Sequence, residues 1–221
     1  MKSLKEIWQK LKNSDDLYIY NAVKYGINPD DVWYDLPEDI EAGLNPEQEN
    51  LVELRRSWNN PAPDGIALPT EIWREVITRR QRYLEVRKHI TDGDIILIND
   101  FITYNLDIRQ FTLDLINETA DSKLVFQFYK ALKSITILDP TCGSGAFLFA
   151  AMNILEDLYD ACINRMREFV TDNPGHSTSH LKNELDAVDN PAHPNLEYFI
   201  YKSIILNNLY GVDIMNEAVE I

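Results

Sequence analysis

The chain has 221 residues, a formal net charge of −15 at pH 7, 45% hydrophobic residues and 10% aromatic residues. This length allows one large domain or two small ones, and the apolar content is sufficient for a buried core. No apolar run reaches the roughly 18 residues of a membrane-spanning helix, and the opening Met-Lys-Ser-Leu-Lys-Glu-Ile-Trp lacks the apolar segment of a signal peptide. The two cysteines, Cys142 and Cys162, are too few for a disulfide framework or a zinc site and fit a reducing cytoplasm.

The acidic charge argues against this chain being the main surface for a nucleic acid, because neutralised phosphates supply most non-specific affinity. Residues 1–50 hold 11 acids against 5 bases and residues 151–200 hold 9 against 3, whereas residues 51–100 hold 8 of each. Any contact with a nucleic acid would therefore come from the balanced stretch or from regions that this chain does not contain.

The first hundred residues predict a mostly α-helical N-terminal region. An apolar face of Leu4, Ile7, Trp8 and Leu11 predicts a helix over residues 1–25. Proline and glycine punctuation from Gly26 to Gly65 predicts loops with one short helix near Glu47–Trp58.

A second helix is predicted from Thr70, as its N-cap, to about Ile90, ended by Thr91-Asp92-Gly93-Asp94. It carries six basic residues: Arg74, Arg79, Arg80, Arg82, Arg87 and Lys88. This basic helix is either a stripe that faces phosphates or, as charge runs more often are, a solvated face paired with acids such as Glu71, Glu75 and Glu85.

Helices are next predicted over about Asp107–Thr119 and Ala146–Val170, with the short β-branched strand Ile135-Thr136-Ile137-Leu138 between them. The strand runs directly into Asp139-Pro140-Thr141-Cys142-Gly143-Ser144-Gly145-Ala146-Phe147-Leu148. Glycines let a backbone turn tightly and approach a ligand, and the helix that follows offers unpaired N–H groups. Asp139 stands at the carboxyl end of a strand, where open α/β sheets hold their ligands.

A second short strand ending in an acid is predicted in Asn208-Leu209-Tyr210-Gly211-Val212-Asp213-Ile214, after an apolar helix over Leu196–Leu206. Asp139 and Asp213 are 74 residues apart, whereas a plain first βαβ unit places its ribose acid about 20 residues after the glycines. The polar, proline-broken stretch over about residues 171–195 is therefore interpreted as an inserted loop. His176 and His180 lie within it, but no third ligand accompanies them, so no metal site is predicted.

The decapeptide after the first strand resembles motif I of the amino methyltransferases that use S-adenosylmethionine (SAM). It is most similar to that of the N6-adenine DNA methyltransferases of restriction-modification and phage-defence systems, among them the large Eco57I-like methylases. The resemblance covers the chain from about Thr103 onward. It implies a site for SAM formed by the turn and by the second strand's end, at Asp139, Pro140, Thr141, Cys142, Gly143, Ser144, Gly145, Phe147, Asp213 and Ile214. In the family the acid at the place of Asp213 binds both ribose hydroxyls and the next residue packs on the adenine, a role a carboxylate can fill.

The catalytic Asn/Asp-Pro-Pro-aromatic tetrapeptide of that family is absent, since none of the five Asn-Pro pairs continues with a proline and an aromatic residue. The chain is therefore expected to be the N-terminal portion of a longer enzyme, without catalytic residues and inactive in methyl transfer on its own. Two alternatives remain open: a piece of an RNA guanine-N2 methyltransferase, which shares a similar turn, and a non-catalytic scaffold or interaction fragment.

Together these features predict an α/β fold: an incomplete Rossmann-like half-domain over residues 101–221, preceded by the helical region over residues 1–100. The expected partners are SAM, double-stranded DNA bound through regions absent from this chain, and restriction or defence-system subunits. The expected location is the cytoplasm, without a membrane.

Overall fold

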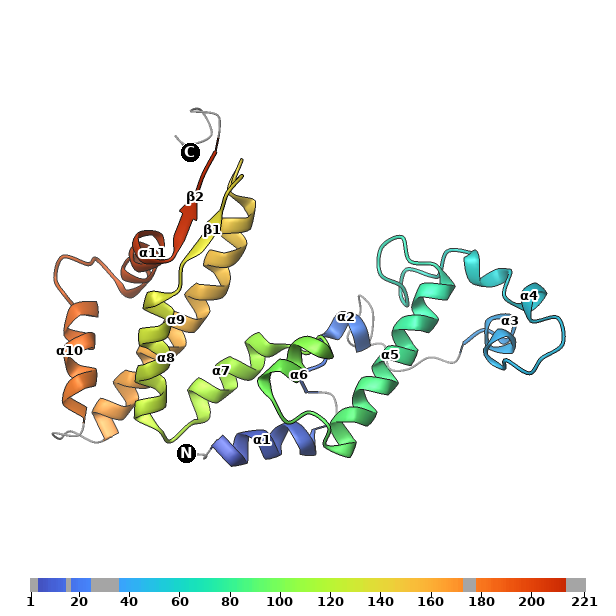
Figure 1. Ribbon diagram of the computed structural model, residues 1–221, viewed down its shortest axis with the longest axis horizontal. Coiled ribbons are helices and arrows are strands. Elements are labelled where there is room, and N and C mark those ends of the chain that lie inside the picture. Colours follow the sequence, from blue (N-terminus) through green and yellow to red (C-terminus); the bar gives the residue numbers. More distant parts are fainter. Residues whose placement is uncertain (1–3, 15–16, 25–35, 173–177, 214–221) are drawn as a thin grey trace. The chain divides into compact units, whose positions relative to one another are not determined.

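The computed structural model describes residues 4–14, 17–24, 36–172 and 178–213 (Figure 1). This part of the chain is mostly helical and contains a parallel sheet of two strands. Trp8–Ile108 form one compact unit, called here the N-terminal unit. The chain from Arg109 onward, with the first residues of the chain, forms the C-terminal unit. The domain limit after residue 100 stays a prediction.

The N-terminal unit is a series of short helices around one long helix. Instead of one helix over residues 1–25, the structure has α1 (Leu4–Asn13) and the separate short helix α2 (Asn21–Lys24). Further along lie α3 (Glu38–Glu41), η1 (Ala42–Leu44), α4 (Leu51–Leu54), η2 (Ser57–Asn59), α5 (Trp73–Asp92) and α6 (Ile98–Thr103). A small core of Ile40, Trp58, Ala67, Trp73, Val76 and Ile77 lies beside the start of α5.

The start of α5 differs from the prediction, whereas its end agrees with it. Thr70 is not the N-cap: its φ of 68° is left-handed, and the helix begins at Trp73 after Ile72. The Glu75 carboxylate accepts a hydrogen bond from the Ile72 N–H at 2.9 Å, which satisfies a donor at the helix start. Gly93, with φ of 81°, ends the helix in the left-handed conformation common after a C-terminus.

The basic residues of α5 contact several neighbours. Arg79 bonds both carboxylate oxygens of Glu71 at 3.0 Å, and the two side chains are only 11% and 10% exposed. Lys88 forms an ion pair with Asp92 on the same helix. These contacts agree with a paired helix face at Arg79 and Lys88.

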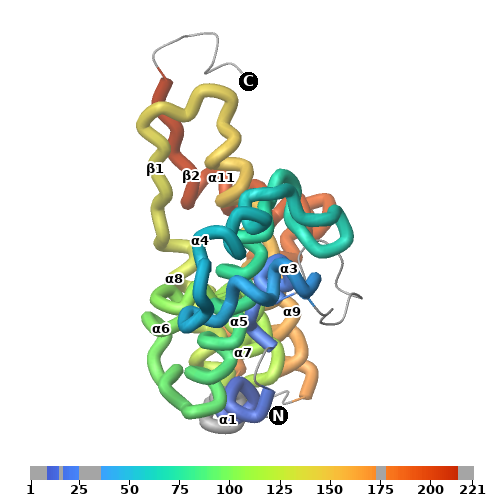
Figure 2. The backbone as a smooth tube through the Cα atoms, turned by 90° about the vertical axis from the view of Figure 1, so that its right-hand side faces the viewer, coloured from blue at the N-terminus to red at the C-terminus, as the bar shows by residue number. Residues whose placement is uncertain are grey.

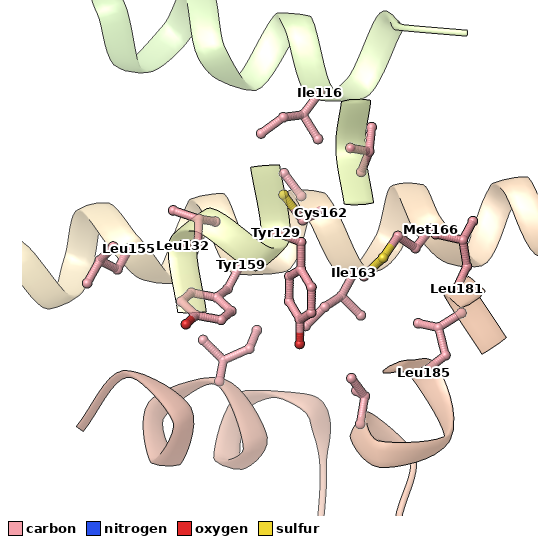
Figure 3. Packing of buried hydrophobic residues seen from close by; sticks show 14 of the residues in the cluster. Ile116, Tyr129, Leu132, Leu155, Tyr159, Cys162, Ile163, Met166, Leu181 and Leu185 are labelled. Carbon is pink, nitrogen blue, oxygen red and sulfur yellow. The ribbon is translucent and has the colours of Figure 1, made fainter. Parts of the chain in front are cut away.

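The C-terminal unit is built around the long helix α9 (Ala146–Asp172). Its other elements are α7 (Ile108–Glu118), α8 (Ser122–Ser134), β1 (Ile137–Asp139), α10 (Ser179–Val188), α11 (Leu196–Asn207) and β2 (Leu209–Gly211). Helices α8, α10 and α11 all pack against α9. The buried side chains between them form one core, part of which Figure 3 shows.

The stretch expected to be an inserted loop contains a core helix, so that interpretation is wrong for α10. Leu181, Leu185 and Val188 are buried in the same core as α9. They recur at the four- and three-residue spacing of a helix face, which polar neighbours conceal in the sequence. His180 packs edge-on against Phe126, with ring centroids 4.7 Å apart, and His176 lies outside the described residues.

Strands β1 and β2 lie side by side and parallel, as Figures 1 and 2 show. Their register pairs Ile137 with Leu209, Leu138 with Tyr210 and Asp139 with Gly211. Because the strands are parallel, their carboxyl ends lie at the same edge of the sheet, and the glycine turn follows β1 there. Both predicted strands are present and form a parallel pair with adjacent ends, although the first begins at Ile137 and not at Ile135, which caps α8.

Candidate functional site

The candidate site is the turn between β1 and α9, together with the chain that leaves β2. The ladder of hydrogen bonds continues beyond the strands: the Val212 N–H donates to the Asp139 carbonyl at 2.9 Å, and the Cys142 N–H donates to the Val212 carbonyl at 3.0 Å. The turn is therefore held by backbone bonds to the residues just after β2. Two segments far apart in the sequence form one edge.

Asp213 lies against the turn. Its carboxylate Oδ2 accepts a hydrogen bond from the Gly143 N–H at 2.7 Å, across 70 residues of sequence. The structure thus brings together Asp213 and the glycine turn, which the sequence pairs only through a resemblance. A carboxylate has further acceptor positions beyond one such bond, so it can also receive hydroxyl donors.

Asp139 makes a local contact. Its Oδ1 accepts a hydrogen bond from the Thr141 N–H at 3.1 Å, which closes the first part of the turn. Asp139 is half-buried, whereas Pro140 and Thr141 are exposed. Asp213 is therefore hydrogen-bonded to a glycine of the turn, whereas Asp139 is hydrogen-bonded to Thr141.

The turn requires its two glycines for conformation. Gly143 has φ of 49° and Gly145 has φ of 74°, both in the left-handed region that costs most residues free energy. A Cβ added at Gly143 would meet no atom within 4 Å, so the space over this peptide is open. An open glycine backbone is what close approach of a ligand to a chain needs.

A cavity of about 460 Å³ lies beside this turn. Four of the predicted site residues line it: Cys142, Gly143, Ser144 and Gly145. Asp139, Pro140, Thr141, Phe147 and Asp213 do not line it. Phe147 is 59% exposed, and Ile214 lies outside the described residues.

The remaining lining residues were not predicted from the sequence. They are apolar or glycine: Leu148, Phe149, Met152, Ile205, Leu209 and Gly211. The three on α9 follow Gly145 at helical spacing, a signal that could have found them. Ile205, Leu209 and Gly211 come from the other segment, and no local pattern links them to the turn.

Gly211 allows the two segments to approach. A Cβ built there would lie 3.0 Å from both the Cys142 Sγ and the Leu148 Cδ1. That spacing is tighter than ordinary van der Waals contact, so a larger residue would force the Cys142 and Leu148 side chains to move by a few tenths of an ångström. The absence of a side chain at Gly211 keeps the cavity wall and the turn close together.

Below the site the core is apolar and holds three titratable groups in their neutral form. Burial raises the pKa of the Cys162 thiol to about 12. Burial also raises the pKa of Tyr159 to about 12, although a hydrogen bond with Asn208 acts in the opposite direction. The pKa of Tyr129 is raised as well, chiefly by burial and then by Glu184. These three side chains are therefore neutral near pH 7.

Among the described residues, no group of three or more His, Cys, Asp or Glu side chains is arranged to hold a metal ion. None of their helices combines the length and apolar character needed to cross a membrane.

Comparison with known proteins gives a match over the same region. Residues 115–221 match the model of a family described as MmeI, DNA-methyltransferase domain. This stretch is similar to a DNA-methyltransferase domain. A relative from Methanocaldococcus jannaschii, provisionally named a type II restriction enzyme and methyltransferase, is 37% identical over 123 residues. No solved structure gives a significant match.

The match to the archaeal relative covers 52% of this chain and 8% of the relative. The chain therefore corresponds to a small part of that protein. The matched family is described as a DNA-methyltransferase domain, and the relative's name describes a type II restriction enzyme and methyltransferase. The narrower Eco57I-like assignment stays a prediction.

Proposed function

We propose that this chain forms the SAM-binding part of a site-specific N6-adenine DNA methyltransferase in a restriction-modification or phage-defence system. The observation that carries the proposal is the Asp213 carboxylate, held 2.7 Å from the Gly143 N–H at the adjacent ends of two parallel strands. The similarity of residues 115–221 to a DNA-methyltransferase domain supports it independently. The strand pair with its helices would be the start of a Rossmann-like domain.

The residues present fit the cofactor in three respects. The positive-φ glycines leave open backbone, where a Cβ at Gly143 would meet nothing within 4 Å. The start of α9 supplies the N–H groups and partial positive charge of a helix N-terminus, which suit the carboxylate of an amino acid. The cavity of about 460 Å³ lies within the range of roughly 300–1,000 Å³ that small-molecule sites occupy.

Each part of the site has a separate role in this proposal. Asp213 would accept hydrogen bonds from the two ribose hydroxyls, and Ile214 would pack on the adenine of SAM. Asp139 and the turn from Pro140 to Gly145 would hold the methionine portion, and Phe147 would contact the cofactor beside them. SAM supplies an electrophilic methyl group on sulfur, and the residues of this chain would fix its orientation. Orientation alone can account for several kcal/mol of a transfer barrier, on the order of 7 or more in favourable cases.

The transfer step itself has no assigned residue here, because the sequence contains no Asn/Asp-Pro-Pro-aromatic tetrapeptide. The target adenine would be extruded from the duplex, as enzymes that modify bases require. The net acidic charge leaves the DNA backbone to be bound by regions outside this chain. On this proposal the chain alone would be inactive towards DNA.

Titration calorimetry tests the cofactor site. SAM is expected to bind the chain saturably, and Asp213→Ala is expected to weaken binding by about tenfold or more, because hydrogen bonds to a charged group are lost. Asp186→Ala is the matched control, since Asp186 is an exposed acid on α10. Equal losses in both variants would show that only overall charge matters.

A ligand comparison tests the role of the carboxylate. Adenosine should compete with SAM better than 2′,3′-dideoxyadenosine does, and Asp213→Ala should abolish this difference.

A second experiment tests the substrate. The complete protein should be expressed in a host without adenine methylation, and the DNA of that host should be digested to nucleosides. Mass spectrometry should then detect N6-methyladenine, and an unmodified genome would contradict the proposed substrate.

A further inference from the structure

Asn208 is the last residue before β2, and its side chain is 0% exposed. A buried primary amide costs free energy unless its polar atoms are all bonded. Here they are: Nδ2 donates to the carbonyls of Leu132 and Ile135, each at 2.7 Å, and Oδ1 accepts from the Tyr159 hydroxyl at 3.0 Å. The backbone of Asn208 is bonded on both sides as well, to Ile204 and to Ile137.

These partners belong to the segments that enter both strands. Leu132 lies in the last turn of α8, and Ile135 is the C-cap of this helix, two residues before the start of β1. Tyr159 lies on α9, the helix that leaves the turn. One amide therefore ties the entrance of β1, the entrance of β2 and the helix after the turn to a single point.

The strands themselves specify their register weakly. Only three residue pairs form the ladder of β1 and β2. The side chains of Leu138 and Tyr210, which are partners in it, are 59% and 48% exposed. Their neighbours Ile137 and Leu209 pack against the core but are only partly buried. With so little buried side-chain surface, packing does little to oppose a slip by one residue, and such a slip turns every side chain to the other face.

A slip would remove the feature that carries the proposed function. Asp213 reaches the Gly143 N–H only because Asp139 pairs with Gly211 and the bonds through Val212 and Cys142 continue that register. Asn208 bonds Ile137 through its carbonyl at 2.7 Å, which is the first bond of the series. The amide that locks this residue in the core also fixes the bond.

We propose that Asn208 is a positioning residue: its buried amide sets the register of β2 on β1 and so places the Asp213 carboxylate on the glycine turn. As a statement about SAM binding this rests on the proposed function, whereas as a statement about the turn it can be tested without a ligand. Asn208 does not touch the cofactor in this proposal and acts only through Asp213.

The test compares the 221-residue chain with Asn208→Leu, which keeps a similar volume and removes all three side-chain hydrogen bonds. Leu181→Ala is the control, because Leu181 is 0% exposed in the same core but lies on α10. Two quantities are measured on folded protein: the Kd for SAM and, without SAM, the hydrogen-exchange rates of the Gly143 and Val212 amides by NMR. Circular dichroism verifies folding.

Asn208→Leu is expected to raise the Kd for SAM and the exchange rate of the Gly143 amide by about tenfold or more, since loss of register removes a charge-assisted bond. Leu181→Ala should lower stability yet leave both quantities within about twofold. An unchanged Gly143 exchange rate in Asn208→Leu overturns the positioning role, whatever happens to the Kd. If the unsubstituted chain ignores SAM, the proposed function fails, and the exchange rates still decide the role of Asn208.

A milder pair of variants covers the case in which Asn208→Leu does not fold. Tyr159→Phe removes one bond to Asn208 Oδ1. Tyr129→Phe removes a buried hydroxyl that has no hydrogen-bond partner within the described part of the chain. Tyr159→Phe should speed exchange of the Gly143 amide by about two- to threefold and Tyr129→Phe should not, because only the first removes a made bond. Equal rates in the two variants contradict the proposal.

Discussion

The two halves of α9 meet different surroundings within the C-terminal unit. Every buried residue of this helix lies between Leu155 and Phe169, among α8, α10 and α11. From Ala146 to Ile154 no residue is buried, and Phe147 and Phe149 are 59% and 56% exposed. The half that follows the glycine turn therefore gains little from packing of its own.

The two parts of α9 therefore have different roles. The part from Leu155 to Phe169, called here the closed half, stabilises the unit through its core. The part from Ala146 to Ile154, called here the open half, carries the glycine turn at its start and is held in place by the closed half. Tyr159, in the closed half, donates a hydrogen bond to Asn208 and so joins this half of α9 to the start of β2. A site built in this way can leave its backbone open to a ligand without depending on the ligand for folding.

The largest contrast is expected between two isoleucines on this one helix. Ile163 is 0% exposed and Ile154 is 47% exposed. Ile163→Ala should lower the free energy of unfolding by about 2–5 kcal/mol, because it deletes buried methyl groups and leaves a cavity. Ile154→Ala should cost less than about 1 kcal/mol. Urea denaturation measures both, and similar losses would show that the open half is packed in solution.

Alkaline pH tests the same core. The raised pKa of Cys162, about 12 against an ordinary 9.0, means that the unfolded chain releases this proton first. Stability from this group is therefore fully present below pH 9 and is lost as the pH rises towards 12. The loss by pH 10.5 should be about 2 kcal/mol at about 1.4 kcal/mol per pH unit.

Urea denaturation under reducing conditions at pH 7, 8.5 and 10.5 measures this dependence. Cys162→Ala should lower stability at every pH but should flatten the fall above pH 9. Tyr159 and Tyr129, whose pKa values are also raised, act in the same direction and remain in the variant. An equal slope in both proteins would assign the alkaline loss to the tyrosines alone.

The sequence predicted the glycine turn better than the buried core of the C-terminal unit. The turn could be predicted because its requirements are local: an acid at a strand end and glycines at positive φ, as found at Gly143 and Gly145. Helix α10 could not, because its three buried residues are spread among polar ones and are buried only by other helices. Asn208 gave no signal, since its partners at Leu132 and Ile135 lie more than 70 residues away. Thr70 resembled an N-cap, but the backbone there is left-handed.

A smaller effect is expected at Gly145, in the turn before α9. Gly145→Ala should lower stability by about 1–2 kcal/mol, because φ of 74° is costly for a residue with a Cβ. The methyl group itself fits, since its nearest neighbour would be Phe149 at 3.5 Å. Ser144→Ala, at an exposed position in the same turn, should change stability by less than about 0.5 kcal/mol. Urea denaturation curves of the two variants check this prediction. Equal curves would mean that the turn adopts another backbone conformation at residue 145 without loss of stability.

The last contrast leaves stability unchanged and compares the two thiols. Cys142 is half-buried and lines the cavity, whereas Cys162 is 0% exposed and its pKa is raised to about 12 by burial. Because the thiolate is the reactive form, iodoacetamide at pH 7.5 should modify Cys142 in the native chain and both cysteines only in denaturant. Mass spectrometry of native Cys142→Ala should then show no adduct, and Cys162→Ala should be modified like the unsubstituted chain. SAM should slow modification of Cys142 several-fold, in proportion to the occupied fraction. Rapid modification of native Cys162 would instead show that the core around the closed half of α9 is accessible to the reagent. The contrast between a buried and an exposed half of this helix would then be wrong.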